Sequence, residues 1–211
     1  MDEIDTPEKA YFLGFFYADG CNDMKQNRAV ISVKGGDEYL LEKFSRFFNS
    51  DRPLTDNNQK RGDIIFPQKV FTLRGKYICN RLLELGAVPQ KTNILEWNIE
   101  NIIKPELISH FIRGFFDGDG CVSLIYNKCG SYRAVVSFVG GSFNFMNSLK
   151  EFLERELKLN VYIRKEGKHK YEIRFSEKDS VLKFKEYIYQ NCSVCLDRKL
   201  QKFMEFEKNK L

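Results

Sequence analysis

The chain has 211 residues, 43% of them apolar and 14% aromatic, which is enough to bury a sizeable core in one large domain or in two of about 100 residues. No apolar run reaches the roughly 18 residues of a membrane span and no basic and then apolar leader opens the chain, so we expect a soluble protein inside the cell, in the cytoplasm, the nucleoid or an organelle matrix. The net charge of +5 comes from residues 109–211, which hold 19 Lys and Arg against 13 Asp and Glu, whereas residues 1–108 hold 15 against 16. Such a nearly balanced charge excludes a histone-like basic protein and permits a polyanion bound on one face.

The first half predicts the order helix, hairpin, helix, hairpin, helix. Thr6 as N-cap and Pro7 in the first turn start a helix that runs to Asp19, and Gly20 ends it by taking the left-handed conformation. Alternating residues predict a hairpin over residues 21–33, with its turn near Asn22 and Asp23. The remaining elements are a helix at 38–48 capped by Asp37, a loop at 49–62, alternating strands at 63–74, a helix at 76–85 and a connection with short helices at 87–104.

The second half predicts the same order about one hundred residues later. Its elements are a helix at 105–119 stopped by Gly120, strands at 121–126 and 132–139, a helix at 143–156, strands at 161–165 and 170–175, and helices at 180–190 and from about Arg198. This period is too long for a solenoid, whose repeats span about 20 to 50 residues. We therefore predict an α+β fold of two half-domains, residues 1–104 and 105–211, related by a pseudo-two-fold axis and joined in one saddle-shaped molecule.

The strongest internal match is between the stretch YFLGFFYADG at residues 11–20 and FIRGFFDGDG at residues 111–120. Residues four apart share a helix face, so Gly14 with Ala18, and Gly114 with Gly118, form two strips without side-chain bulk. Two such strips allow two helices to pack backbone to backbone, and we predict this helix interface between the halves. The alternative is two unrelated buried helices with incidental glycines.

The two aspartates at the ends of these helices occupy costly positions. Asp19 and Asp119 each lie at a negative helix C-terminus, which disfavours a carboxylate by roughly 0.3–1 kcal/mol. Close packing of the helices would add repulsion between them. Divalent cations held by both carboxylates would reverse both penalties. The alternative for a single Asp-Gly pair is a capping turn.

The two stretches resemble the double-motif LAGLIDADG homing endonucleases, which are monomeric, and the resemblance extends over the whole chain. It implies a sequence-specific, double-strand DNA endonuclease that uses two or more Mg²⁺ ions, with Mn²⁺ able to substitute. It further implies that each half lays a curved antiparallel sheet on the DNA. Arg113 and Tyr17 depart from the family pattern, and Tyr17 puts contacts at the helix end in doubt. The implied metal site consists of Asp19, Asp119 and the adjoining Gly20 and Gly120, and the implied catalytic residues are Asp19, Asp119, Lys91 and Lys199. For the two lysines an ordinary surface position weighs equally, and Arg198 competes with Lys199.

Cations in the predicted hairpins are the candidates for DNA contacts, because strand residues alternate between the two faces of a sheet. They are Lys25, Arg28, Lys34, Lys69, Arg74, Lys128, Arg133, Arg164, Lys168, Lys170 and Arg174.

Two further function classes stay open. One is a relative of the same fold that binds nucleic acid without cutting DNA, as an RNA-splicing maturase or a DNA-binding regulator. The other is a zinc-dependent interaction module built on Cys192 and Cys195, which form a C-x-x-C pair without a second pair at comparable spacing.

Overall fold

A computed structural model describes residues 1–89, 93–126 and 132–208. The first half contains α1 (Pro7–Asp19), β1 (Gly20–Asp23), β2 (Arg28–Lys34), α2 (Glu38–Phe47), β3 (Thr55–Asp56), β4 (Gln59–Arg61), β5 (Ile64–Phe66), β6 (Gln68–Arg74) and α3 (Lys76–Glu84). α4 (Ile99–Ile102) ends the first half, and the second half contains the 3₁₀ helix η2 (Pro105–Leu107), α5 (Ile108–Asp119), β7 (Gly120–Tyr126), β8 (Tyr132–Gly140), α6 (Phe143–Leu157), β9 (Tyr162–Gly167), β10 (Lys170–Phe175), α7 (Lys178–Tyr189) and α8 (Asp197–Lys208).

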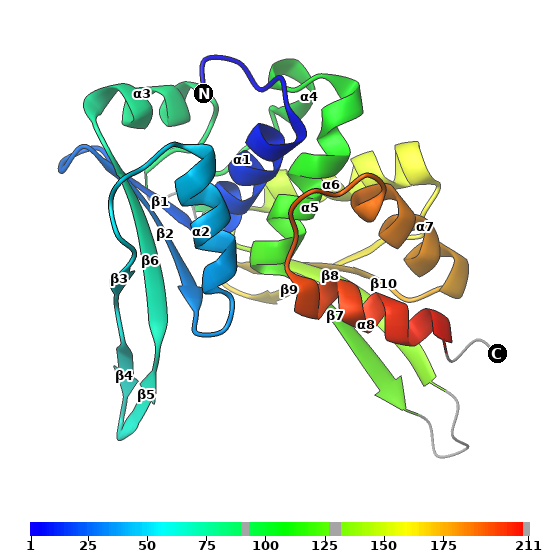
Figure 1. Ribbon diagram of the computed structural model, residues 1–211. Coiled ribbons are helices and arrows are strands. Elements are labelled where there is room, and N and C mark those ends of the chain that lie inside the picture. Colours follow the sequence, from blue (N-terminus) through cyan, green and yellow to red (C-terminus); the bar gives the residue numbers. More distant parts are fainter. Residues whose placement is uncertain (90–92, 127–131, 209–211) are drawn as a thin grey trace.

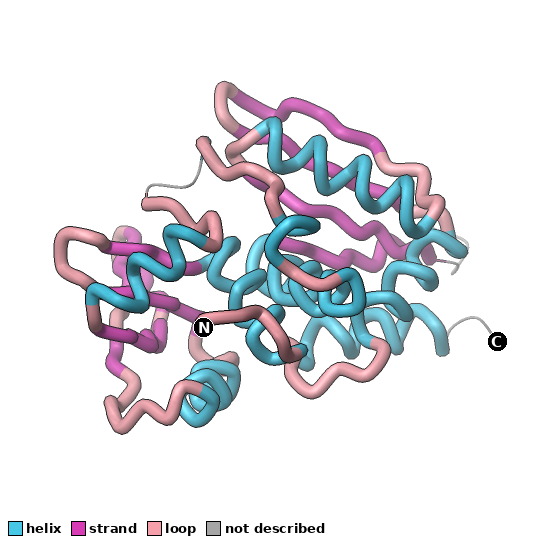
Figure 2. The backbone as a smooth tube through the Cα atoms, turned by 90° about the horizontal axis from the view of Figure 1, so that it is seen from above, coloured by secondary structure: helices cyan, strands magenta, loops and turns pink. Residues whose placement is uncertain are grey.

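Each half has one four-stranded antiparallel sheet with helices on one of its faces (Figure 1). The strand orders are β1-β2-β6-β3 and β7-β8-β10-β9, and seen from above the strands form two separate groups with helices between them (Figure 2). The predicted α+β class with two antiparallel half-domains is therefore confirmed. None of the helices formed by the described residues is both long and apolar enough to span a bilayer.

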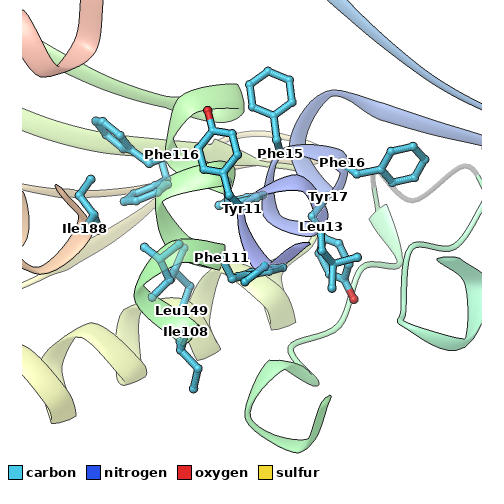
Figure 3. Close-up of a cluster of buried hydrophobic side chains, with 14 of the residues drawn as sticks. Tyr11, Leu13, Phe15, Phe16, Tyr17, Ile108, Phe111, Phe116, Leu149 and Ile188 are labelled. Carbon is cyan, nitrogen blue, oxygen red and sulfur yellow. The ribbon is translucent and has the colours of Figure 1, made fainter. Parts of the chain in front are cut away.

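The two motif helices, α1 and α5, lie together at the centre of the molecule and hold the two halves in contact (Figure 1). Their large side chains fill a mostly aromatic core (Figure 3). Phe12 packs edge-on against Phe44 and Phe48 of the first half, and Phe116 packs against Phe138 and Phe184 of the second. Each motif helix thus belongs to the core of its own half while its glycine strip faces the other helix.

Several sequence expectations are wrong in detail. The first hairpin turns at residues 24–27, later than predicted, because Asn22 is a buried strand residue whose amide donates to the carbonyls of Cys79 and Ala87 at 3.0 and 3.1 Å. The segment 49–62 is not only loop, since it forms β3 and β4, and β4 pairs with β5 in a ribbon outside the main sheet. Asp37 does not cap α2 with its side chain.

The two glycines that follow the motif helices are not left-handed. Gly20 has φ −79° and Gly120 has φ −82°, which any residue can adopt. A Cβ at these positions would lie 2.4 Å from Cδ2 of Phe16 and 2.1 Å from Cδ2 of Phe116. Space beside a core phenylalanine, rather than a left-handed turn, therefore requires glycine here.

Candidate active site at the ends of the motif helices

The motif helices cross with their backbones in contact. A Cβ on Gly14 would lie 1.9 Å from the carbonyl oxygen of Phe111, and a Cβ on Gly114 would lie 2.0 Å from that of Tyr11. No side chain fits in either space without moving the helices apart. The structure thus brings together the residues of the expected interface, and the two contacts are nearly symmetric.

The same crossing brings the two helix ends together. A Cβ on Gly118 would lie 2.2 Å from the Cβ of Ala18 and 3.3 Å from Oδ2 of Asp19. The Asp19 carboxylate therefore lies against the last turn of α5, beside the residue that precedes Asp119. Both aspartates are exposed, so a substrate on this surface can reach them.

The donors at these helix ends suit a hard cation, because Mg²⁺ is usually bound by one or two carboxylates together with phosphate oxygens and water. Among the described residues no three or more His, Cys, Asp and Glu side chains are grouped so that they could hold a metal ion. A cation at Asp19 and Asp119 would thus need further oxygens from a substrate and water. Cys192 and Cys195 likewise lack two further ligands within the described ranges.

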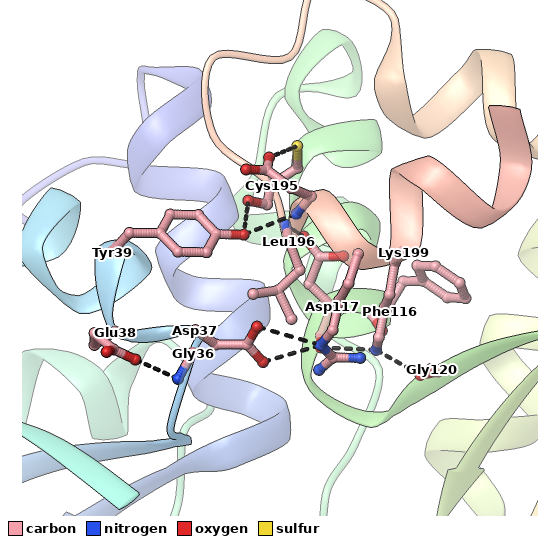
Figure 4. A network of polar contacts seen from close by, with 12 residues as sticks. Gly36, Asp37, Glu38, Tyr39, Phe116, Asp117, Gly120, Cys195, Leu196 and Lys199 are labelled. Atoms are coloured by element: carbon pink, nitrogen blue, oxygen red, sulfur yellow. Dashed lines mark hydrogen bonds and ion pairs between the residues drawn. The ribbon is translucent and has the colours of Figure 1, made fainter.

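Lys199 lies at the end of α5 but is buried, not a surface lysine (Figure 4). Its Nζ donates to the carbonyls of Phe116 at 2.5 Å, Asp117 at 2.7 Å and Gly120 at 2.5 Å. Burial lowers the pKa of Lys199 to about 8, against the opposing effect of the nearby Asp117 carboxylate. A cation bound to these carbonyls offsets the negative end of the helix dipole directly below Asp119. Lys91, its expected counterpart, lies outside the described residues.

Two buried charged residues of α5, Arg113 in its middle and Asp117 in its last turn, are not among the predicted site residues. Asp117 accepts from the Tyr11 hydroxyl and from the Leu196 amide, both at 2.8 Å, and burial raises its pKa to about 6. Arg113 is fully buried and donates to the carbonyls of Val194 at 2.9 Å and Ile188 at 2.8 Å. The only sequence signal was that Arg113 departs from the family pattern.

At the corresponding end of α1 a neutral side chain takes the place of Asp117. Tyr17, which stands where the second copy has Asp117, donates to the carbonyl of Leu85 at 2.6 Å. The Tyr17 hydroxyl needs the neighbouring Gly86, whose Cβ would lie 2.1 Å away. The helix-end contact that Tyr17 put in doubt is thus made by a neutral hydrogen bond.

The face of the first sheet that the helices leave uncovered carries part of the expected cation set. Arg28 and Arg74 are opposite each other on β2 and β6, and both line a hollow of about 630 Å³. Lys34 is on the same face of β2, and Lys25 is exposed in the hairpin turn. Lys69 does not share this face, because it alternates with Val70 and lies on the side of the buried Phe71, where it pairs with Asp56 at 2.7 Å.

The uncovered face of the second sheet carries Arg133, Arg164, Lys170 and Arg174, which alternate with core residues such as Ile173. Arg164 pairs with Glu172 at 2.5 Å, and Lys170 pairs with Glu166 at 2.8 Å. Lys168 is exposed in the turn between β9 and β10, and Lys128 lies outside the described residues. The cations of this face are thus partly neutralised by neighbouring carboxylates.

Comparison with known proteins agrees with this architecture. Residues 106–189 match the family model of the LAGLIDADG-like domain. The I-SmaMI LAGLIDADG homing endonuclease bound to cleaved DNA superposes with a TM-score of 0.58 at 14% identity, over 98% of this chain and 89% of that one. The chain has the LAGLIDADG fold.

One further solved structure and one sequence relative are similar to this chain. Full-length DUF199/WhiA from Thermatoga maritima superposes with a TM-score of 0.62 at 15% identity, over 99% of this chain and 62% of that one. In sequence, the probable translation initiation factor IF-2 of Methanocaldococcus jannaschii is 26% identical over 190 residues, which are 83% of this chain and only 15% of that protein. The chain therefore spans only part of these two relatives, and proteins of different names contain its fold.

Proposed function

We propose that this LAGLIDADG protein is a sequence-specific endonuclease that hydrolyses both strands of a DNA target by a divalent-metal mechanism and acts as a monomer. The observation that carries the proposal is the contact of Asp19 with the last turn of α5, beside Gly118 and so next to the residue before Asp119, with both aspartates exposed. The DNA-bound I-SmaMI structures of the same fold support DNA as the partner.

In this proposal Asp19 and Asp119 are the residues that would hold Mg²⁺. The bound cations supply a Lewis acid for the phosphate oxygens and lower the pKa of the attacking water. The main chain of Gly20 and Gly120 begins the first strand of each sheet directly after these carboxylates. Arg28, Arg74, Arg133 and Arg174 would bind phosphates or base edges on either side of the centre. Lys199 would keep the α5 terminus in place. For Lys199 to take a direct part in proton transfer, its ammonium would have to break at least one of its hydrogen bonds to carbonyls.

The proposal is tested by incubating the protein with a library of duplex targets and Mg²⁺ and sequencing the ends produced. Wild type is expected to cut both strands at a defined site, and Asp19→Asn and Asp119→Asn are each expected to abolish double-strand cleavage while retaining binding. If wild type binds duplexes that it does not cut, the nuclease assignment is wrong. Full double-strand cleavage by either variant would refute the metal assignment.

A second candidate is a nucleic-acid-binding protein of the same fold that does not cut, such as a maturase or a regulator. This candidate is supported by the match with DUF199/WhiA, which shares the fold and whose name does not describe a nuclease. It is also supported by Lys199, whose three donors are all engaged by carbonyls. Both candidates predict that DNA affinity falls steeply with salt, as phosphate neutralisation requires. Only the nuclease predicts Mg²⁺-dependent products.

A further inference from the structure

The start of α8 is held by the other half of the molecule. Nε of Arg198 donates to both carboxylate oxygens of Asp37, at 2.9 and 3.3 Å, and the Asp37 side chain is only 8% exposed (Figure 4). The Tyr39 hydroxyl accepts from the Asp197 amide at 2.8 Å and donates to the Cys195 carbonyl at 3.3 Å. Two side chains at the start of α2 in the first half thus bind the first turn of α8 in the second.

Lys199 is the next residue after Arg198, and it binds in the opposite direction. Its Nζ is fixed on the carbonyls at the end of α5, while Arg198 reaches toward α2. The first turn of α8 therefore bridges the two halves directly below Asp119. A change at α2 would move this turn and with it the Lys199 ammonium.

We infer that Asp37 and Tyr39 are positioning residues for Lys199, and that the first half-domain thereby controls the α5 end that carries Asp119. The effect on cleavage rests on the proposed function, because it assumes that Asp119 serves one DNA strand. The positioning of Lys199 does not rest on it. The chemistry explains why Asp37 is not a helix cap: its carboxylate is used for the guanidinium of Arg198.

At the equivalent position of the second half, a neutral side chain contacts the first half. Ser142 follows a Gly-Gly pair and precedes α6, as Asp37 follows one and precedes α2. Its hydroxyl donates to the Leu95 carbonyl at 2.6 Å and accepts from the Phe145 amide at 3.3 Å. This contact is neutral and is made to the main chain, whereas Asp37 binds a charged side chain.

The first test does not depend on activity. Wild type, Asp37→Asn and Tyr39→Phe are treated briefly with acetic anhydride, and acetylation of Lys199 is measured by mass spectrometry. Wild type is expected to be protected, and both variants are expected to react faster by roughly tenfold, the scale of losing one partner of a charge-assisted or buried hydrogen bond. Glu207→Gln is the matched control, because it removes an ion pair of the same helix, with Lys185, that does not involve the first half. Equal protection in all four proteins would overturn the inference.

The second test uses an intact duplex that wild type cleaves, with a different dye on each strand, so that cleavage of the two strands is measured separately. Lys199→Met identifies the strand that depends on Lys199. Asp37→Asn and Tyr39→Phe are expected to slow that strand roughly tenfold and the other less than about twofold. Equal slowing of both strands overturns the control of the Asp119 end. If wild type cuts no duplex, the proposed function fails, and the acetylation result still decides whether Lys199 is positioned by Asp37 and Tyr39.

Discussion

The two motif helices make nearly the same backbone contacts where they cross, but their buried side chains beside the crossing differ. Beside the crossing, α1 and α5 carry buried residues at the same three positions, 10, 13 and 17 in the first copy and 110, 113 and 117 in the second. The first set is Ala10, Leu13 and Tyr17, whereas the second is His110, Arg113 and Asp117, and all six are buried. Backbone contact at the glycines therefore does not require the two cores to be alike.

The difference shows what the charged copy does in this fold. Buried ionic groups add little stability compared with well-packed apolar residues, so their presence needs another reason. Arg113 and Asp117 bind the carbonyls of Ile188 and Val194 and the amide of Leu196, all in or next to the segment that leads into α8. The buried charges of α5 therefore bind the segment that precedes α8, the helix that carries Lys199.

The largest expected effect is at the part that the two helices share. Gly14→Ala and Gly114→Ala should each lower the free energy of unfolding by about 3 kcal/mol or more, because the new Cβ would overlap a carbonyl oxygen of the opposite helix. Urea denaturation measures both. Gly167→Ala is the control, with its nearest atom at an ordinary 3.8 Å, and should change stability by less than about 0.5 kcal/mol. A cost at Gly14 much smaller than at Gly114 would contradict a symmetric crossing.

The next effect distinguishes α5, which has buried charged side chains, from α1, which has buried uncharged ones at the same positions. Arg113→Leu, which copies Leu13, should cost about 3 kcal/mol because it leaves Asp117 buried without the nearby guanidinium. Asp117→Asn should cost a similar amount, since it disrupts the contacts with Tyr11 and Leu196. The double variant should cost at least about 1 kcal/mol less than the sum of the two. A double-mutant cycle by urea denaturation checks this, and strict additivity would show that the two charges act separately.

The smallest expected effect is a pH dependence that only the second copy has. Burial, together with the Arg113 guanidinium, lowers the pKa of His110 from 6.5 to about 4, and Nδ1 of the neutral ring lies 2.7 Å from Nη1 of Arg113. The unfolded chain binds this proton at higher pH than the folded one. The contribution of His110 to the free energy of unfolding is therefore fully present above pH 6.5. It is lost as the pH falls toward 4, which lowers the free energy of unfolding by about 2 to 3 kcal/mol.

The measurement for His110 is the free energy of unfolding of wild type and His110→Gln across this range of pH. The difference between the two curves removes other groups, including Asp117, whose raised pKa makes stability fall as the pH rises between 3.8 and about 6. Parallel curves would show that His110 has the same pKa in the folded and the unfolded state.

Sequence periodicity predicted most of the helices and strands, and its errors have physical causes. The first hairpin turn was placed too early because Asn22 favours turns by its chemistry, whereas here its amide binds two carbonyls of the α3 region. Lys69 was grouped with Arg28 and Arg74 because a list of strand cations ignores the face on which each lies. At Asp19 and Asp119 the sequence pattern predicts bound cations, with a capping turn as the alternative, whereas the buried Lys199 already offsets one helix end.

The sequence by itself determined the duplication, the two motif helices and the glycines that allow them to touch, because these follow from local spacing and from the absence of a side chain. Only the tertiary structure decided which residues hold the end of α5. Arg113, Asp117 and Lys199 meet through segments about 80 residues apart, and Asp37 meets Arg198 across 161. No local pattern records such contacts, since their geometry exists only after the two halves have packed.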